Sequence, residues 1–416
     1  MPSNNFSEET QFDYLYDALA QKFPGIQAAD GKNTVFQFMQ TPLGANWKSG
    51  DDADAFELAN STSLDLGGFF MRGSSFANSY KDMVLSIEPT NGVDNPQYRD
   101  CVNKIAIIDN NLDSTRKQAQ ADYDLFKANH SEYEGTFEQW VVDPWGGKSW
   151  GDKLDELNVQ RDNYATTQAN VLAALDTALS QAQKEVNPWA QTMNITEGNQ
   201  VREVPLITIG GDLQRDILSW NNRGEGDYDF DVIITKDQEI TSPWKTTYTT
   251  TVKQKCLHTE VETNVNTSRI IADKNYKLRV TAVGANSYLI NRGQWYHEDL
   301  ASPETPIVEG SRWNSDSFFG LSGNLHLIPE TIFVLYKPSI QLTISTQIYK
   351  QEFEEHADVA INWVDLLGFR FAFDGLASLQ PEGDEVTTTV TFVAGSNQLA
   401  QIIGINSKVA WNGNTA

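Results

Sequence analysis

Three aspartates that alternate with aromatic residues are the strongest candidate for metal chemistry in this chain. Asp227, Asp229 and Asp231 are separated by Tyr228 and Phe230, so on a β-strand their carboxylates would share one face. Calcium takes about six to eight oxygen ligands with flexible geometry and could use such a face. The stretch lacks the glycine and glutamate spacing of an EF-hand loop. An acidic, exposed strand face explains the same pattern, so calcium is the only metal considered and no cofactor is expected.

The five histidines do not form a recognised catalytic or metal-binding pattern. No two have the spacing of metal ligands, and the chain contains neither HExxH nor GxSxG. His297 is the most distinctive, because the segment Trp295-Tyr296-His297-Glu298-Asp299 combines aromatic rings with carboxylates in a turn. The segment could form a small-ligand site, and an aromatic cluster at a strand end fits it equally well. No catalytic residue is assigned.

An aromatic-rich turn is the clearest candidate for a binding surface. Residues 137–150 contain Phe137, Trp140, Trp145 and Trp150, whereas connections between helices are usually short and polar. If the turn projects, these side chains need a protein partner, a neighbouring copy or a membrane interface. If it folds back, they belong to the core. We expect all four to anchor a contact with a partner or a second copy, with Trp145 the best single candidate.

Apolar residues at heptad spacing predict the helices that carry this turn. They recur every seven positions from Tyr98 to Trp140 and from Leu157 to Ala178, which indicates two amphipathic helices. Residues 96–190 are therefore predicted to form an antiparallel helical hairpin with the aromatic turn at its tip. Charged residues interrupt the neighbouring apolar stripe, so a free-standing coiled coil is not expected.

Beyond Asn187-Pro188 the pattern changes to alternating apolar and polar residues. Short strand-like runs, separated by Gly, Asn, Asp and Pro, continue over 191–416 and are typical of an antiparallel β-sandwich. Residues 1–95 are mixed and mostly helical, with a first helix predicted over 7–23. The expected fold is therefore α+β, with a helical N-terminal half and a β-rich C-terminal half.

A long alternating stretch within the β-rich region suggests an alternative function. Residues 248–266 alternate threonine and valine with charged residues. β-Pore-forming toxins carry amphipathic hairpins of this type, which join a barrel after oligomerisation. A long sheet strand with a polar outer face fits the same stretch. Contact with a membrane is accordingly expected only after a conformational change.

Composition limits the possible partners and compartments. The chain has 416 residues, 40% of them hydrophobic, with a formal net charge of −25. Such a surface repels nucleic acid and anionic membranes, and two cysteines without a CxxC motif favour neither a zinc site nor a disulfide framework. The N-terminal residues do not resemble a secretion signal, and no apolar run could span a membrane. We therefore expect an acidic, soluble, cytoplasmic protein that could leave the cell only by a non-Sec route.

Three short segments of the β-rich region are distinctive. They are Arg292-Gly293-Gln294-Trp295-Tyr296, Ile328-Pro329-Glu330-Thr331 before the run at 336–344, and Gln401-Ile402-Ile403-Gly404. These segments resemble an uncharacterised family of bacterial and fungal proteins that have a helical hairpin and a Ser/Thr-rich β region. The resemblance covers about the last third of the chain and implies no known activity.

These observations predict a non-enzymatic protein that self-assembles or binds a protein partner of unknown identity. A homo-oligomer or a complex with another protein is expected, without nucleic acid. A pore-forming or membrane-perturbing, toxin-like protein is the alternative. A hydrolase that uses carboxylates ranks third, because 56 acidic residues make any pair that is close in sequence uninformative.

Overall fold

The computed structural model describes most of the chain. The described residues are 8–26, 34–44, 53–63, 68–89, 95–130, 133, 135–144, 146–197, 200–224, 226–236, 238, 257–259, 266–309, 311–320, 322–354, 363–367, 369–372, 382–383, 386–394 and 399–410. The chain forms two compact units. Unit 1 combines Met1–Ala77, Thr192–Gly293 and Asn324–Trp411, and unit 2 combines Asn78–Gln191, Gln294–Gly323 and Asn412–Ala416. Each unit is therefore assembled from segments that lie far apart in the sequence.

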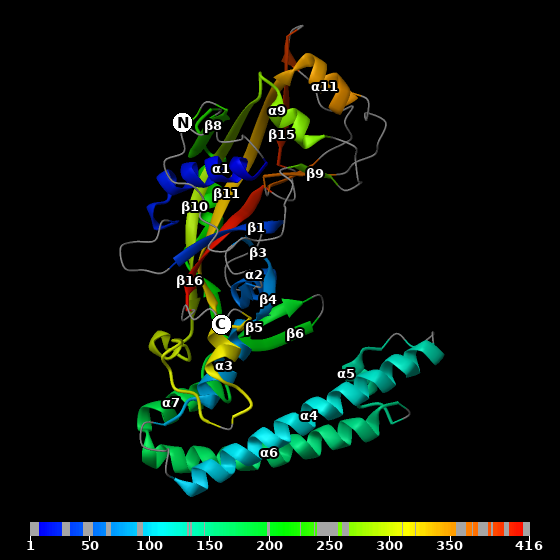
Figure 1. The fold of residues 1–416 in the computed structure, drawn as a ribbon, viewed down its shortest axis with the longest axis vertical. Helices are drawn as coiled ribbons and strands as arrows, with labels where there is room; N and C mark the ends of the chain where they lie inside the picture. The colour runs from blue at the N-terminus through cyan, green and yellow to red at the C-terminus, as the bar shows by residue number, and fades with distance from the viewer. Residues whose placement is uncertain are drawn as a thin grey trace. The chain divides into compact units, whose positions relative to one another are not determined.

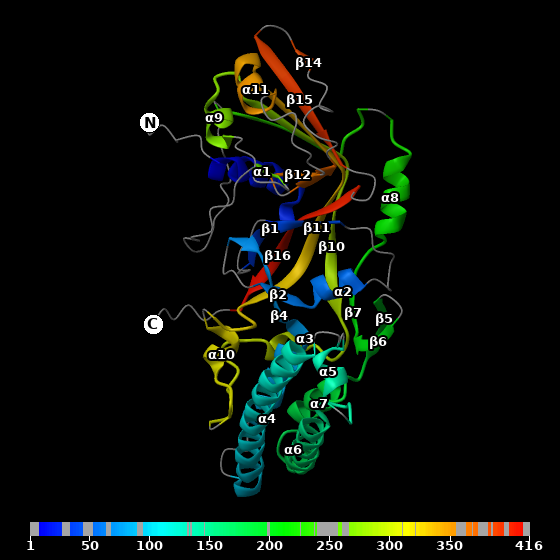
Figure 2. The same ribbon diagram turned by 90° about the vertical axis from the view of Figure 1, so that its right-hand side faces the viewer.

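A nine-stranded sheet forms the centre of unit 1. Its central strand, β11 (Leu327–Ser345), pairs antiparallel with β10 (Lys277–Arg292), and the two run side by side in Figure 2. The other edge of β11 pairs in succession with β16 (Ala400–Val409) and β15 (Thr387–Val393). Residues 332–336 of β11 are all buried, as expected for a strand covered on both faces. The two long strands thus organise the unit.

The N-terminal residues belong to this sheet. β1 (Thr34–Gly44) pairs antiparallel with β16, so that Thr34 lies opposite Lys408, and parallel with β3 (Phe69–Phe70). This differs from the separate region expected over residues 1–95, because β1 and β3 join a sheet whose other strands come from residues 207–409. Three further strands extend the sheet: β7 (Ile207–Ile209) and β8 (Phe230–Thr235) on β10, and β14 (Glu382–Gly383) on β15.

Short helices and small sheets complete unit 1 (Figure 1). The helices are α1 (Glu8–Lys22), η1 (Pro24–Ile26), α2 (Ala53–Ala59), α8 (Leu213–Asn221), α9 (Thr267–Ala272) and α11 (Thr346–Glu352). The small sheets are β2 (Ser61–Ser63) with β4 (Arg72–Ser75), β5 (Thr192–Glu197) with β6 (Gln200–Pro205), and β9 (Leu257–Thr259) with β12 (Trp363–Leu366) and β13 (Phe369–Ala372).

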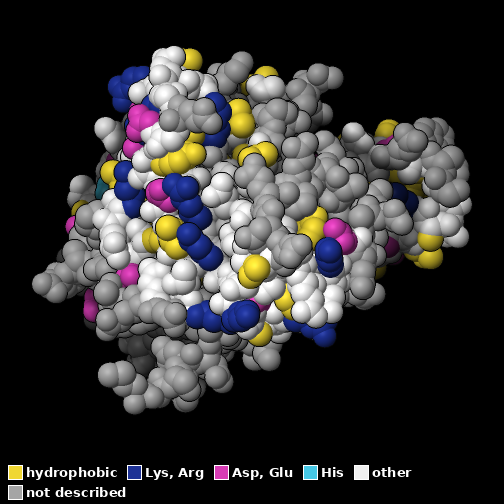
Figure 3. Space-filling view, turned by 90° about the horizontal axis from the view of Figure 1, so that it is seen from above, with side chains coloured by type: hydrophobic (Ala, Val, Ile, Leu, Met, Phe, Trp, Pro, Cys, Tyr) yellow, Lys and Arg dark blue, Asp and Glu magenta, His cyan; other side chains and the backbone are white. Residues whose placement is uncertain are grey.

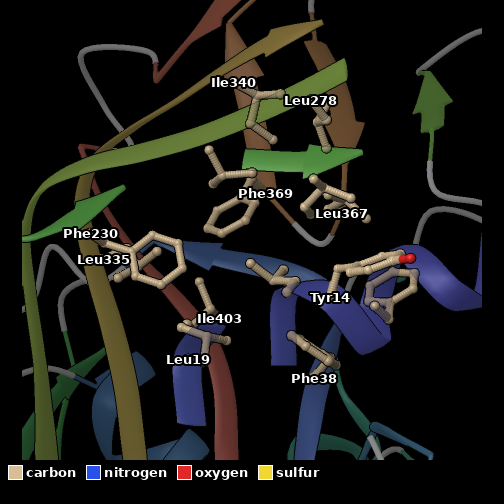
Figure 4. Close-up of a cluster of buried hydrophobic side chains, with 14 of the residues drawn as sticks. Tyr14, Leu19, Phe38, Phe230, Leu278, Leu335, Ile340, Leu367, Phe369 and Ile403 are labelled. Carbon is tan, nitrogen blue, oxygen red and sulfur yellow. The ribbon is translucent and has the colours of Figure 1, made fainter. Parts of the chain in front are cut away.

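The core of unit 1 lies between α1 and the large sheet (Figure 4). Helical spacing places Leu15 and Leu19 of α1 on one face, and neither side chain is exposed. Aromatic rings join the helix to the strands. The ring centroids of Phe12 and Phe38 of β1 lie 5.2 Å apart in an edge-to-face arrangement.

On the face shown in Figure 3, hydrophobic side chains form small separate groups among basic and polar ones, which is normal for a protein surface.

Unit 2 is built mainly from helices. α3 (Phe76–Ser86) enters it, and α4 (Pro96–Asn129) and α6 (Lys148–Leu175) are its longest elements. The Asn95 side chain caps α4 by accepting a hydrogen bond from the backbone N–H of Tyr98. The remaining helices are α5 (Phe137–Trp140), α7 (Thr177–Val186), η2 (Glu298–Leu300) and α10 (Ser315–Phe319).

The fold is therefore α+β, as the sequence predicts. Among the helices that the structure describes, none combines the length and the apolar character that a membrane span requires.

Candidate functional site

The helical arm, which we define as α4, α6 and the residues between them, is the most distinctive part of unit 2. The side-chain contacts between the two helices show that they run in opposite directions. Near the base of the arm, Arg161 Nε donates a hydrogen bond to Asp109 Oδ1 at 2.7 Å. Near the tip, Trp150 Nε1 donates to Asp122 Oδ2 at 2.9 Å. These two contacts fix the register of the helices, which lie side by side in Figure 1.

The middle of the arm has no closed core. Every residue of α4 and α6 is described, and no residue of α4 between Ile108 and Ala119 is buried. In α6, no residue before Gln168 is buried. Leu112 and Leu157, which belong to the apolar stripes of the two helices, are only half-buried. Two helices alone therefore leave the apolar residues of this section partly in water.

Large apolar side chains also lie on the outside of the arm. Ile107 and Leu125 of α4 are 60% and 63% exposed, and Val159 of α6 is 61% exposed. A single exposed aliphatic side chain is ordinary. Here, however, Val159 lies within the section without a core and Ile107 lies next to it, so the arm presents apolar surface that one copy of the chain does not cover.

The arm helices are close to electrically neutral in an otherwise acidic chain. α4 contains five basic and five acidic residues, and α6 contains three basic and four acidic ones. The two helices together thus account for one of the 25 net negative charges. A second acidic molecule meets less repulsion here than the average surface would produce.

The tip of the arm folds back on itself. Phe137 and Trp140 are buried with Ala119 and Tyr123 of α4 in a small cluster, and the rings of Tyr123 and Trp140 lie 5.6 Å apart. The expectation that Phe137 and Trp140 are exposed anchors is therefore wrong. Gly147 makes this packing possible, because a Cβ there would lie 2.4 Å from the Trp140 ring.

The other two tip tryptophans have different positions. Trp150 is half-buried, and besides its hydrogen bond to Asp122 it contacts Lys153, whose Nζ lies 4.4 Å from the ring centroid. Trp145, the best single candidate from the sequence, lies outside the described residues. Trp150 is thus the one predicted anchor that the structure describes with part of its side chain at the surface.

The three aspartates do not converge on a shared site. Arg279 binds Asp231 through two hydrogen bonds of 2.9 and 2.7 Å, and these lower the pKa of the Asp231 carboxyl. Asp229 forms an ion pair with Arg223 at 2.7 Å, and Asp227 is exposed. Within the described part of the chain, no group of three or more His, Cys, Asp or Glu residues is arranged to hold a metal ion. The sequence pattern did not indicate the two arginines that pair with these aspartates, because Arg223 lies between α8 and β8 and Arg279 lies in β10.

His297 lines a groove of about 550 Å³, bounded by apolar residues such as Leu179 and Leu300. Its Nε2 lies 2.6 Å from Glu185 Oε2, the only hydrogen-bond contact of the ring among the described residues. The hydroxyl of Tyr80 accepts a hydrogen bond from the His297 backbone N–H at 2.8 Å. Trp295 next to it is fully buried. The histidine thus ties α7 to an aromatic cluster, and no described serine, threonine or cysteine forms a hydrogen bond with its ring.

A second cavity, of about 130 Å³, lies at the base of the arm. Its charged lining residues are Asp82 of α3, Asp109 of α4, Arg161 of α6 and Arg312. Sequence patterns gave no sign of this site, because its charged residues come from four separate segments and no motif connects them.

Comparisons with protein-family models, with curated proteins and with solved structures found no match. The resemblance of the last third of the chain to an uncharacterised family stays a prediction.

Proposed function

We propose that the protein self-associates, without catalysing a reaction, and that the arm of one copy binds the arm of a second copy. The observation that carries this proposal is the lack of a closed core in the middle of the arm, around Leu112 and Leu157. Amphipathic helices in water bury their apolar stripe against some other surface. A second copy supplies a surface of matching length and pattern.

Two antiparallel helix pairs can pack as a four-helix bundle. Such a bundle would enclose the half-buried seam of each copy, and Ile107 and Val159, on the outside of each arm, would lie at the edge of the contact. Burying one aliphatic side chain contributes about 1.5–3 kcal/mol. Several such side chains from each copy would together contribute an amount comparable to the about 4–15 kcal/mol that association costs in lost freedom of motion.

The distribution of charge supports the same surface. The residues outside α4 and α6 carry 24 of the 25 net negative charges, four of them in the tip segment 130–147, so a contact along the two helices brings together fewer like charges than a contact through the rest of the chain. At the tip, we propose that Trp150 contributes its exposed part to the contact and that Trp145 joins it. Phe137 and Trp140 support that surface from beneath, since both are buried.

Size-exclusion chromatography with light scattering tests the proposal directly. The wild-type chain should give the mass of a dimer or a larger oligomer at micromolar concentrations. Val159→Asp and Ile107→Asp should each weaken association by about tenfold, since each places a charge at the edge of an apolar contact and about 1.4 kcal/mol corresponds to tenfold.

Val201→Asp is the matched control. Val201 is 67% exposed, similar to Val159, and lies on β6 in unit 1. This substitution adds the same charge outside the arm and should leave the mass unchanged. A monomeric wild-type chain at high micromolar concentration would contradict the proposal. So would an equal effect of Val159→Asp and Val201→Asp.

A further inference from the structure

The cavity at the base of the arm has charged groups of both signs and an apolar wall. Its volume of about 130 Å³ is several times what a single water molecule needs. Two arginines, two aspartates and Trp313 are among the residues that line it. The apolar part is formed by residues of α3, α4, α6 and the 308–313 segment, namely Leu85, Val102, Ile105, Ala106, Ala165 and Val308.

Asp82 is the acidic group in this cavity without a direct partner. Its side chain is half-buried, and it forms no hydrogen bond or ion pair with any described residue. Asp109, by contrast, accepts the hydrogen bond from Arg161. A carboxylate that loses water on folding without gaining a partner destabilises the protein. An incoming cation with N–H donors would remove this penalty.

The two arginines that line the cavity each keep guanidinium N–H donors that are not used by the contacts described above. Arg161 uses Nε for Asp109, and its terminal nitrogens donate to no described residue. Arg312 forms an ion pair with Asp113 through one nitrogen, and its guanidinium lies 4.7 Å from the Trp313 ring centroid. A guanidinium binds a carboxylate well because its donors form a planar fork. The cavity thus offers a place for an anion beside its unpaired carboxylate.

We propose that this cavity binds a small aliphatic amino acid in its zwitterionic form. The ligand carboxylate accepts hydrogen bonds from Arg161 and Arg312, and the ligand ammonium group donates to Asp82. Its hydrocarbon side chain packs on Val102 and Ile105. The charged lining groups balance one another, two arginines against two aspartates. A ligand with no net charge therefore preserves this balance, whereas an anion or a cation alone would upset it.

The binding is testable with the full-length chain and defined probes. Thermal melting and titration calorimetry would use L-alanine, L-valine and L-leucine, because a ligand that binds the folded state raises the melting temperature. N-acetyl-L-valine and L-valinamide each lack one of the two charges. At least one free amino acid should raise the melting temperature at millimolar concentration, and neither blocked derivative should do so.

Two variants and one control locate the site. Asp82→Asn keeps the shape of the side chain and removes its charge, and Arg161→Lys keeps the charge and removes the planar fork. Each should weaken amino-acid binding at least tenfold. Asp162→Asn, an exposed position on α6 next to Arg161, should leave binding unchanged. The proposal is overturned if no free amino acid shifts the melting temperature. It is also overturned if the blocked derivatives bind equally well, or if Asp82→Asn binds as tightly as the wild-type chain.

Discussion

At the scale of single residues, Asp82 is held in an environment that disfavours its charged form. Burial raises the pKa of its carboxyl, and Asp109 adds to this effect, while Arg161, Arg312 and Lys81 act in the opposite direction. The folded chain therefore binds this proton more tightly than the unfolded chain. The contribution of Asp82 to stability is complete below the ordinary carboxyl pKa and is lost as the pH rises through the raised pKa.

Asp82→Asn should accordingly raise the melting temperature near pH 7 when no ligand is present. The gain should shrink as the pH falls toward the ordinary carboxyl range, where Asp82 in the wild-type chain is also neutral. Melting curves of both proteins between pH 3 and pH 8 measure this difference. Asp162→Asn, at an exposed position, should show no such pH-dependent gain. A lower melting temperature for Asp82→Asn at pH 7 would mean that its charge stabilises the fold.

The residues at the arm tip show where prediction from sequence ends. Their composition identifies a distinctive turn, but a turn rich in tryptophan can project or fold back. The outcome depends on Ala119 and Tyr123 of α4, against which Trp140 packs. It also depends on Gly147, because the absence of a side chain there lets the turn lie against the Trp140 ring. Asp82 is a harder case, because its neighbours in the cavity come from positions that only the folded chain brings together.

At the scale of elements, periodicity predicts where helices lie better than where they end. The apolar spacing of the first helix continues to Trp140, whereas α4 ends at Asn129. The second helix is divided at Asp176. This residue is the C-cap of α6, and its side chain caps α7 by accepting a hydrogen bond from the backbone N–H of Leu179 at 3.0 Å. Local capping interrupts a helix without disturbing the apolar spacing on either side, so the pattern alone cannot show it.

The long strands show the opposite error. The sequence predicts short strands over 191–416, yet β10 runs for 16 residues and β11 for 19. Gly284 and the pair Lys337-Pro338 look like turn signals, yet in the structure they lie within strands. Residues 248–266, expected to form a long strand, lie mostly outside the described residues. The predicted β-sandwich stays a prediction, because the described strands form one large sheet and three small ones.

Gly284 is needed where α8 crosses β10. A Cβ at this position would lie 2.0 Å from the ring of Trp220, and that ring is stacked on Tyr336 of β11. Gly284→Ala should therefore force α8 off the strand and lower the free energy of unfolding by about 1–3 kcal/mol. Urea denaturation measures the change. Gly224→Ala is the control, because no atom lies within 4 Å of the added methyl group. Equal stability of Gly284→Ala and wild type would show that α8 does not pack closely here.

At the scale of the whole molecule, the division into units depends on pairings between distant parts of the chain. β1 near the N-terminus pairs with β16 near the C-terminus, and unit 2 takes Gln294–Gly323 in addition to the helices that precede Thr192. Amphipathic patterns report which face of an element is buried and not which other element covers it. The sequence pattern therefore predicts domains that follow one another along the chain. In the structure, each unit instead combines several separate segments.

Net charge makes the proposed self-association sensitive to salt in a defined direction. Each copy carries −25 formal charges, so bringing two copies together costs repulsive energy, while the arm contact itself is apolar and nearly neutral. The screening length falls from about 30 Å at 0.01 M salt to about 8 Å at 0.15 M. Association should therefore strengthen as sodium chloride rises over this range, which sedimentation or light scattering would show as a lower dissociation constant. A contact built from opposite charges would weaken instead. Val159→Asp should remain weaker than wild type at every salt concentration, because the cost of burying its charge in an apolar contact is not removed by screening.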